Sequence, residues 1–455
     1  MSDILALLQC LNPYITMTTL RQMKHIITAM LTMTGQVTML NISRWTDKGG
    51  SYRTVQRFFH TAIPWALAFW QFFRQHLHNP ADVYLIAGDE TIVTKSGKKT
   101  YGLDRFFSSL YGQPVPGLSF FALSLISVTE RHSYPVMVEQ IVRTAEEKAA
   151  AKAKKGKKKA EPRATKRRPG RPKGSQNKDK TQVTFTPELL LIKTMLQKLL
   201  LLVGSTLPLT YLLLDGKFGN NNALQMARQC GLHLVSKLRH DAALYFPYEG
   251  PYTGRGPYRK YGDKIDYDRI PDAYLQQMTI EDGIETRIYQ KTMLHKEVAQ
   301  PLNVVIIVKT RLETQSRAHV VLFSSDLDLA FELLIDYYAL RFQIEFNFRD
   351  AKQFWGLEDF MNVKETAVTN AANLSLFMVN VTHLLLYQFR HLNPQAGVLD
   401  LKAHFHGRRY VSETLKLLPE MPDPILLSQV FDAVAQLGCI HPVEPCLSSL
   451  NWRRY

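Results

Sequence analysis

The sequence is poor in cysteine and has no long uninterrupted apolar run. The most apolar stretch, 189–203, is interrupted by Lys193 and Lys198 and is too short to span a membrane. No basic segment precedes an apolar one at the N-terminus, so no secretory signal is evident. The scattered cysteines exclude a disulfide framework and favour a reducing cytoplasm. There are four of them, Cys10, Cys230, Cys439 and Cys446.

Acidic residues are scarce relative to basic ones. The 455 residues include 40 Asp and Glu against 56 Lys and Arg, a formal net charge of +16. Such a surplus suggests a polyanionic partner, with nucleic acid ahead of an anionic membrane. Residues 148–180 alone hold fifteen Lys and Arg against two acids, so they carry +13 of the total. This segment has few large apolar residues, and we predict a flexible basic insertion.

The centre of the basic insertion reads Arg168-Pro-Gly-Arg171-Pro-Lys173-Gly. A Gly-Arg-Pro core among basic residues resembles an AT-hook, an arm whose arginines enter a narrow A·T minor groove. The alternative is a solvated polybasic linker that binds phosphates without sequence preference. Either reading predicts DNA binding that weakens with salt, because bound cations release counterions from the DNA.

The first 75 residues have helical periodicity, with expected helices at 18–33, 37–45 and 52–60. Ser51 is a suitable N-cap for the third helix. The apolar face of this helix contains Tyr52, Val55 and Phe59. A second, polar face contains Arg53, Gln56, Arg57 and His60. The pattern resembles a helix-turn-helix whose recognition helix reads bases and phosphates. The alternative is an ordinary three-helix bundle with a solvated basic face.

The middle of the chain alternates strands and helices. A strand at 83–87 leads to Gly88-Asp89, and another at 209–214 leads to Asp215-Gly216. We also expect a strand at 118–128 and a buried helix at 187–202 with Thr186 as its N-cap. Strands that are apolar at nearly every position belong at the centre of a covered sheet, and sites form where such strands end. A single Asp after a strand is typical of a turn, but two predict neighbouring carboxylates.

A third acid, Glu345, lies on an expected helix at 330–355. At 100° per residue, a stripe about 80° wide collects polar side chains between apolar walls, which is typical of a helix that lines a cleft. The alternative is a ladder of i,i+4 ion pairs through Arg341, Glu345 and Arg349. The residues of the stripe are Tyr338, Arg341, Glu345, Arg349 and Lys352. Phe342 and Phe346 belong to one apolar wall, and Asn347 is expected on the solvent side.

Together, Asp89, Asp215 and Glu345 predict a metal site. Three adjacent carboxylates repel one another unless a cation lies between them. Hard oxygen ligands select Mg²⁺ or Mn²⁺, and two such ions about 3.5–4 Å apart can activate a water or a 3′-hydroxyl at a phosphodiester. Arg341, Arg349 and Lys352 beside the third acid would hold flanking phosphates.

Tyr338-x2-Arg341-x3-Glu345-x6-Lys352 resembles the Tyr-Arg-Glu-Lys signature of bacterial insertion-sequence DDE transposases. The resemblance implies an α/β fold: a ribonuclease-H-like mixed sheet with flanking helices, a β-rich insertion, an N-terminal helical DNA-binding domain and a helical C-terminus. It also implies cut-and-paste transposition, in which strands are cleaved at transposon ends and transferred into target DNA. The expected domains are a helical DNA-binding domain at 1–75, a catalytic core at 76–147, 183–237 and 318–370, the AT-hook-like insertion at 148–182, the β-rich insertion at 238–317 and a helical C-terminal region at 371–455.

The resemblance also implies roles for individual residues. Asp89, Asp215 and Glu345 would bind two Mg²⁺ or Mn²⁺ ions, while Tyr338, Arg341 and Lys352 would grip phosphates near an extruded base. The family stacks that base on an insertion-domain Trp, but this chain has no Trp between Trp70 and Trp355. Either another aromatic side chain replaces it, with Tyr252, Tyr258 and Tyr261 as candidates, or the hairpin intermediate of the family is handled differently.

A basic hairpin follows the first acid. Lys95, Lys98 and Lys99 are expected either to contact the DNA backbone or simply to face solvent. The expected partners are double-stranded DNA, as terminal inverted repeats and target, and a second copy in a synaptic homodimer. No membrane partner is expected, and the location is cytoplasmic and nucleoid-associated.

Three rival functions make different predictions. His406-x2-Arg409 resembles one box of a tyrosine recombinase, which needs no metal, but a matching second Arg and nucleophilic Tyr are not evident. A structure-specific nuclease on the same core would cut DNA without joining it to a target. A non-catalytic DNA-binding protein would not depend on the three carboxylates.

Overall fold

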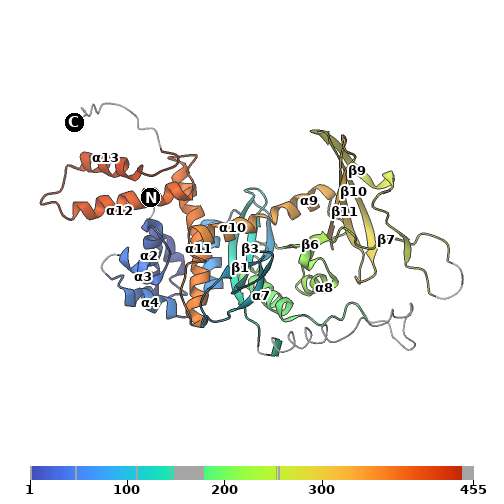
Figure 1. Ribbon diagram of the computed structural model, residues 1–455, viewed down its shortest axis with the longest axis horizontal. Helices are drawn as coiled ribbons and strands as arrows, with labels where there is room; N and C mark the ends of the chain where they lie inside the picture. Colours follow the sequence, from blue (N-terminus) through green and yellow to red (C-terminus); the bar gives the residue numbers. More distant parts are fainter. Residues whose placement is uncertain are drawn as a thin grey trace. The chain divides into compact units, whose positions relative to one another are not determined.

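A computed structural model describes residues 3–46, 49–108, 111–144, 146–147, 179–252, 254 and 257–442 (Figure 1). The AT-hook-like residues Arg168, Arg171 and Lys173 lie outside these ranges. The chain divides into two compact units. The first comprises 1–79, 97–101 and 347–455, and the second comprises 80–96 and 102–346.

The first unit is helical. The expected helices at 18–33, 37–45 and 52–60 are present as α2, α3 and α4, and α11 extends into the expected helical region at 371–455. Ser51 caps α4, since its hydroxyl accepts a hydrogen bond from the Thr54 amide. The elements are α1 (Ile4–Leu8), η1 (Gln9–Leu11), α2 (Met17–Thr32), α3 (Met39–Arg44), α4 (Tyr52–His60), α5 (Trp65–His76), α11 (Glu365–Arg390), α12 (Val398–Leu415) and α13 (Pro424–Ala435).

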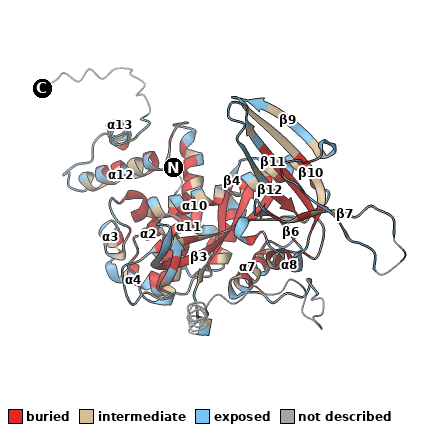
Figure 2. Cartoon of the chain, turned by 45° about the vertical axis from the view of Figure 1, so that its right-hand side comes forward, coloured by how far each residue is buried: buried red, intermediate tan, exposed pale blue. Residues whose placement is uncertain are grey.

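The core of this unit forms around α11, most of which is buried in Figure 2. Phe377 on α11 has ring-centroid distances of 5.9 Å to Trp65, 5.5 Å to Phe69 and 5.0 Å to Phe72 on α5. These tilted and edge-on contacts are favourable for aromatic rings and add to the free energy of burial. Helices α5 and α11 are therefore held together by interlocking aromatic side chains.

Asn370 on α11 holds the C-terminal end of α4. Its side-chain amide donates hydrogen bonds to the carbonyl oxygens of Phe59 (2.9 Å) and Thr61 (2.7 Å). Its side-chain oxygen accepts a hydrogen bond from the Trp65 indole at 2.7 Å. Helix ends leave carbonyl groups without partners, and this buried amide supplies one. The C-terminal turn of α4 is thus fixed to α11.

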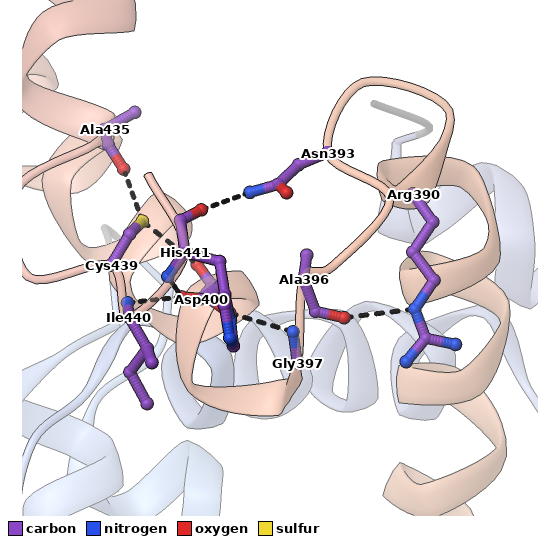
Figure 3. A network of polar contacts seen from close by, with 9 residues as sticks. All are labelled: Arg390, Asn393, Ala396, Gly397, Asp400, Ala435, Cys439, Ile440 and His441. Atoms are coloured by element: carbon purple, nitrogen blue, oxygen red, sulfur yellow. Dashed lines mark hydrogen bonds and ion pairs between the residues drawn. The ribbon is translucent and has the colours of Figure 1, made fainter. Parts of the chain in front are cut away.

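A second buried polar residue, Asp400, organises the end of the first unit (Figure 3). Its carboxylate accepts hydrogen bonds from the amides of Gly397 (2.9 Å) and His441 (3.0 Å) and pairs with His441 Nδ1 at 2.9 Å. The Cys439 thiol donates to the Ala435 carbonyl at 3.5 Å. Both Cys439 and His441 therefore have structural roles among the described residues.

The second unit is built on a mixed sheet, as the α/β expectation requires. Among the described residues the sheet has twelve strands, and β5 pairs in parallel with β1 and β6, whereas the other pairs are antiparallel. The strand order is β2-β3-β1-β5-β6-β12-β11-β10-β7-β8, with β4 on β3 and β9 on β10. The strands are β1 (Tyr84–Thr94), β2 (Asp104–Ser108), β3 (Gln113–Ser127), β4 (His132–Ile141), β5 (Tyr211–Leu214), β6 (His233–Leu238), β7 (Leu244–Pro247), β8 (Tyr261–Lys264), β9 (Leu275–Glu281), β10 (Ile284–His295), β11 (Leu302–Arg311) and β12 (Arg317–Ser324).

Helices accompany this sheet. The predicted helix at 187–202 is present as α7, and the Thr186 hydroxyl accepts a hydrogen bond from the Leu189 amide at its start. The segment 238–317 continues the same sheet through β10 and β11 rather than forming a separate one. The remaining elements are α7 (Pro187–Val203), η2 (Gly216–Phe218), α8 (Asn221–Gln229), η3 (Asp272–Tyr274), α9 (Phe331–Leu340) and α10 (Gln343–Gln353), which crosses the boundary between the units.

Three details differ from the sequence predictions. Tyr52 is 42% exposed and Phe58 is fully buried, so Phe58 takes the place of Tyr52 on the apolar face of α4. Asn347, expected on the solvent side of its helix, is 2% exposed. The expected single helix at 330–355 is two helices, α9 and α10. No helix in the described part of the chain is long and apolar enough to cross a membrane.

We predict that Asn370→Ala lowers the free energy of unfolding by about 3 kcal/mol, because buried groups lose their hydrogen-bond partner. Urea unfolding of the full chain measures this change. The control is Asn222→Ala, since the Asn222 side chain makes no hydrogen bond within the described residues. Equal stability of both variants would contradict the anchoring role of Asn370.

Candidate active site

Asp89 lies within β1, five residues before its end. The predicted strand ended at Asp89, but β1 continues to Thr94 because its antiparallel pairing with β3 extends to Gly117. Gly88 precedes the acid for a steric reason. A Cβ atom there would lie 2.9 Å from both Leu214 Cδ2 and Phe121 Cζ. The missing side chain lets neighbouring strands pack closely beside Asp89.

Asp215 follows β5 directly, as predicted. The parallel pairing of β1 with β5 aligns Gly88 with Leu214, so the next residue on each strand is an aspartate. The backbone carbonyl of Asp215 accepts hydrogen bonds from the Ser236 hydroxyl (2.8 Å) and from the Phe218 amide (3.0 Å). The register therefore places two carboxylates side by side, and the hydrogen bonds fix the chain just after β5.

Glu345 lies in the first turn of α10, close to the break that separates this helix from α9. At the break the Phe342 amide bonds to the Ala339 carbonyl (3.1 Å), and the Ile344 amide bonds to the Arg341 carbonyl (3.2 Å). These i→i+3 bonds tighten the backbone, so a mapping at 100° per residue does not continue from Tyr338 to Glu345. Phe342 and Phe346, expected as an apolar wall, are 48% and 36% exposed.

Arg341 connects two of the three acids. Its guanidinium contacts Asp89 Oδ2 and Glu345 Oε1, each at 3.3 Å. The Arg341 side chain is 12% exposed, and its carbon Cζ lies 5.8 Å from the centre of the Tyr338 ring. The structure thus brings Asp89, Asp215, Glu345, Arg341 and Tyr338 together in the second unit.

A model of the DDE superfamily endonuclease family matches residues 6–300, about two thirds of the chain. The chain belongs to the DDE superfamily endonuclease family. No curated protein matches it. The matched range contains Asp89 and Asp215 and ends before Glu345. Family membership implies a DNA substrate and divalent-metal-dependent cleavage.

The carboxylates of this DDE endonuclease influence one another electrostatically. The pKa of Asp89 is raised to about 6, chiefly by burial and also by the negative charges of Asp215 and Glu345, while the hydrogen bond from the Glu90 amide and the charge of Arg341 act in the opposite direction. Burial also raises the pKa of Tyr338, and Arg341 opposes that shift. Asp215 and Glu345 therefore lie near enough to Asp89 for their charges to affect its ionisation.

A divalent metal fits this donor set. Asp215 Oδ1 is buried and has no hydrogen-bond partner among the described residues, so this carboxylate oxygen is available to a cation. Carboxylate oxygens are the ligands that Mg²⁺ and Mn²⁺ prefer. Within the described part of the chain, no three acids, histidines or cysteines form a ready-made metal cluster. Arg341 lies between Asp89 and Glu345 instead.

The other predicted DNA-binding residues lie in several places. Arg53, Gln56 and Arg57 are exposed on α4, and Lys98 and Lys99 are exposed in the segment after β1, where Lys95 is half-buried. Arg349 pairs with Asp350 at 2.9 Å, and Lys352 pairs with Glu358 at 3.2 Å. These two cations lie in the first unit.

A network beside the catalytic candidates was not predicted. Lys217 pairs with Glu90 at 2.9 Å and with Glu188 at 2.6 Å, and the Ser119 hydroxyl donates to Glu90 at 2.6 Å. Glu90 follows Asp89, and Lys217 follows Asp215 by two positions. The network therefore ties β1 to the turn after β5. Its only signal in the sequence is a second charged residue close to each aspartate.

We predict a pH-dependent contribution of Asp89 to stability. Because its pKa rises from 3.8 to about 6 on folding, Asp89 stabilises the fold below about pH 4 and loses this contribution as the pH rises through 6. In metal-free buffer, the free energy of unfolding of wild type should fall by about 2 kcal/mol relative to that of Asp89→Asn between pH 4 and pH 8. Urea unfolding at both pH values measures the difference. If the free energy of unfolding changed by the same amount in both proteins, Asp89 would ionise like an exposed acid.

Proposed function

We propose that this DDE endonuclease is a transposase that cuts DNA at the ends of a mobile element and joins those ends to a target. The observation that carries the proposal is the aligned pair Asp89 and Asp215, with Arg341 linking Asp89 to Glu345. The Tyr-Arg-Glu-Lys spacing supports the insertion-sequence, cut-and-paste type. The core would be ribonuclease-H-like, with 238–317 as the β-rich insertion.

Asp89, Asp215 and Glu345 would hold two Mg²⁺ or Mn²⁺ ions. When bound, such ions activate an attacking oxygen and stabilise the leaving oxygen of a phosphodiester. Arg341 and Tyr338 would orient a phosphate beside the carboxylates, with Arg349 and Lys352 on flanking phosphates. Hydrolysis of one phosphodiester leaves a 3′-hydroxyl, and this hydroxyl then displaces the 3′-oxygen from a phosphodiester in the target.

Binding to DNA would use surfaces outside the carboxylate site. Arg53, Gln56 and Arg57 of α4 are exposed beside buried apolar side chains, as expected for a recognition helix. The basic insertion with Arg168, Arg171 and Lys173 would add contacts to phosphates or the minor groove. Lys95, Lys98 and Lys99 would contact the backbone near the cleavage site. Synapsis of two ends would require a homodimer acting on DNA in the bacterial cytoplasm.

The decisive experiment incubates the full chain with DNA that carries the ends of its own element, a target plasmid and Mg²⁺. We expect cleavage at the ends and joining to the target, identified by sequencing the products. Cleavage without joining would favour a structure-specific nuclease on the same core. Binding without cleavage would favour a non-catalytic DNA-binding protein, and cleavage unaffected by chelators would exclude the metal-dependent mechanism.

We predict that Asp89→Asn, Asp215→Asn and Glu345→Gln each reduce cleavage by about a thousandfold or more, because each removes a carboxylate that would hold the metal ions, and those ions stabilise the transition state. DNA affinity should change little. A gel assay of cleavage and a binding titration measure the two effects.

Matched controls carry the same chemical changes elsewhere on the second unit. They are Asp336→Asn and Glu332→Gln on α9, and both should cleave like wild type. If a variant at Asp89, Asp215 or Glu345 cleaved at the wild-type rate, that residue would not belong to the site.

We predict that replacing 148–178 with an uncharged linker of equal length weakens DNA binding and flattens its salt dependence. Each lost phosphate contact lowers the slope of log affinity against log salt by about 0.9. This range spares Lys180, whose carbonyl accepts a hydrogen bond from Asn221. Binding titrations at several salt concentrations provide the slope, and an unchanged slope would show that the insertion does not touch DNA.

A further inference from the structure

Arg341 is largely buried, yet its two ion pairs are longer than is typical. Its two contacts to carboxylates are both 3.3 Å long, whereas charge-assisted hydrogen bonds of this kind are typically about 2.7–2.9 Å. Arg239 and Asp241, by comparison, form a two-point pair at 2.9 and 3.0 Å. Arg341 Nε is also buried without a hydrogen-bond partner among the described residues. The guanidinium is therefore confined between two acids without optimal bonding to either.

This position has a clear electrostatic cause. Asp89 and Glu345 repel each other and also face Asp215, so a bare cluster of three charges would be costly in a partly buried setting. A guanidinium in the gap between Asp89 and Glu345 offsets part of that cost. It also occupies the oxygen atoms that a divalent cation would need.

We propose that Arg341 is an internal counter-ion that holds the carboxylate site in place of metal and must leave the gap between Asp89 and Glu345 before a divalent cation binds there. The inference rests on the proposed function, since it takes these carboxylates to be metal ligands. It gives Arg341 a role besides phosphate contact: the side chain competes with metal while DNA is absent. The apparent metal affinity is then reduced by the fraction of molecules in which the gap is free.

The test measures Mn²⁺ binding to the full chain without DNA by isothermal titration calorimetry. If the gap is free in about one molecule in ten, Arg341→Gln should bind Mn²⁺ about tenfold more tightly than wild type. Arg341→Lys keeps the positive charge but lacks the planar fork that bridges two carboxylates. It should also bind Mn²⁺ severalfold more tightly. Arg239→Gln removes an exposed arginine from the same unit and should match wild type.

A second measurement, the melting temperature with and without Mn²⁺, remains informative when a variant is less stable than wild type. Because ligand binding stabilises the folded state, saturating Mn²⁺ should raise the melting temperature of Arg341→Gln more than that of wild type. Equal Mn²⁺ affinity and equal thermal shifts in the two proteins would overturn the proposal. Tighter binding in Arg341→Gln but wild-type binding in Arg341→Lys would overturn the bridging role of the guanidinium, because any positive charge near the acids would then have the same effect on metal affinity.

One further arm separates this inference from the proposed function. Asp215→Asn is added to Arg341→Gln, and Mn²⁺ binding is measured again. Loss of binding shows that Mn²⁺ occupies the carboxylate site, so a failure of the first comparison would count against the counter-ion role alone. Unchanged binding would place the metal elsewhere and would count against the proposed function itself.

Discussion

Repulsion among carboxylates is the constraint on which the candidate site depends. Asp89 is mostly buried, and Asp215 and Glu345 lie near enough to raise its pKa further. Such a site is stabilised by a positive charge inside it or by protonation of one of its acids. In this structure Arg341 supplies that charge, and in a metal-dependent endonuclease the cation would supply it during catalysis. The three carboxylates therefore account for the observed ion pairs with Arg341 and would also be the ligands in the proposed metal site.

The sheet makes this crowding possible. Parallel pairing of β1 with β5 aligns the residues that precede Asp89 and Asp215, and Gly88 leaves room for side chains of the adjacent strands. On the same two segments, Lys217 joins Glu90 to Glu188. Glu90, directly after Asp89, and Lys217, two residues after Asp215, therefore link the two segments that carry these aspartates. The backbone holds the charged groups together against their mutual repulsion.

Much of this arrangement could be predicted from the sequence, because long apolar runs ending in acids specify central strands with functional ends. The neighbouring positions of Asp89 and Asp215, the helix after Thr186 and the exposed basic face of α4 follow from such local patterns. The break between α9 and α10 could not be predicted, since neither Pro nor Gly occurs near Arg341 to mark it. The burial of Phe58 in place of Tyr52 depends on tertiary packing, which periodicity within one helix does not reveal.

The buried amide of Asn370 has a consequence for the proposed reading of DNA by α4. It fastens the end of α4 to the central helix of its own unit, so the exposed side chains Arg53 and Gln56 project from a rigid support. A presenting surface of this kind gives up little conformational entropy when it docks. Selectivity among DNA sequences would then depend on how well each site fits the fixed surface of α4. At a site that fits poorly, the DNA would have to deform, because the protein surface would not.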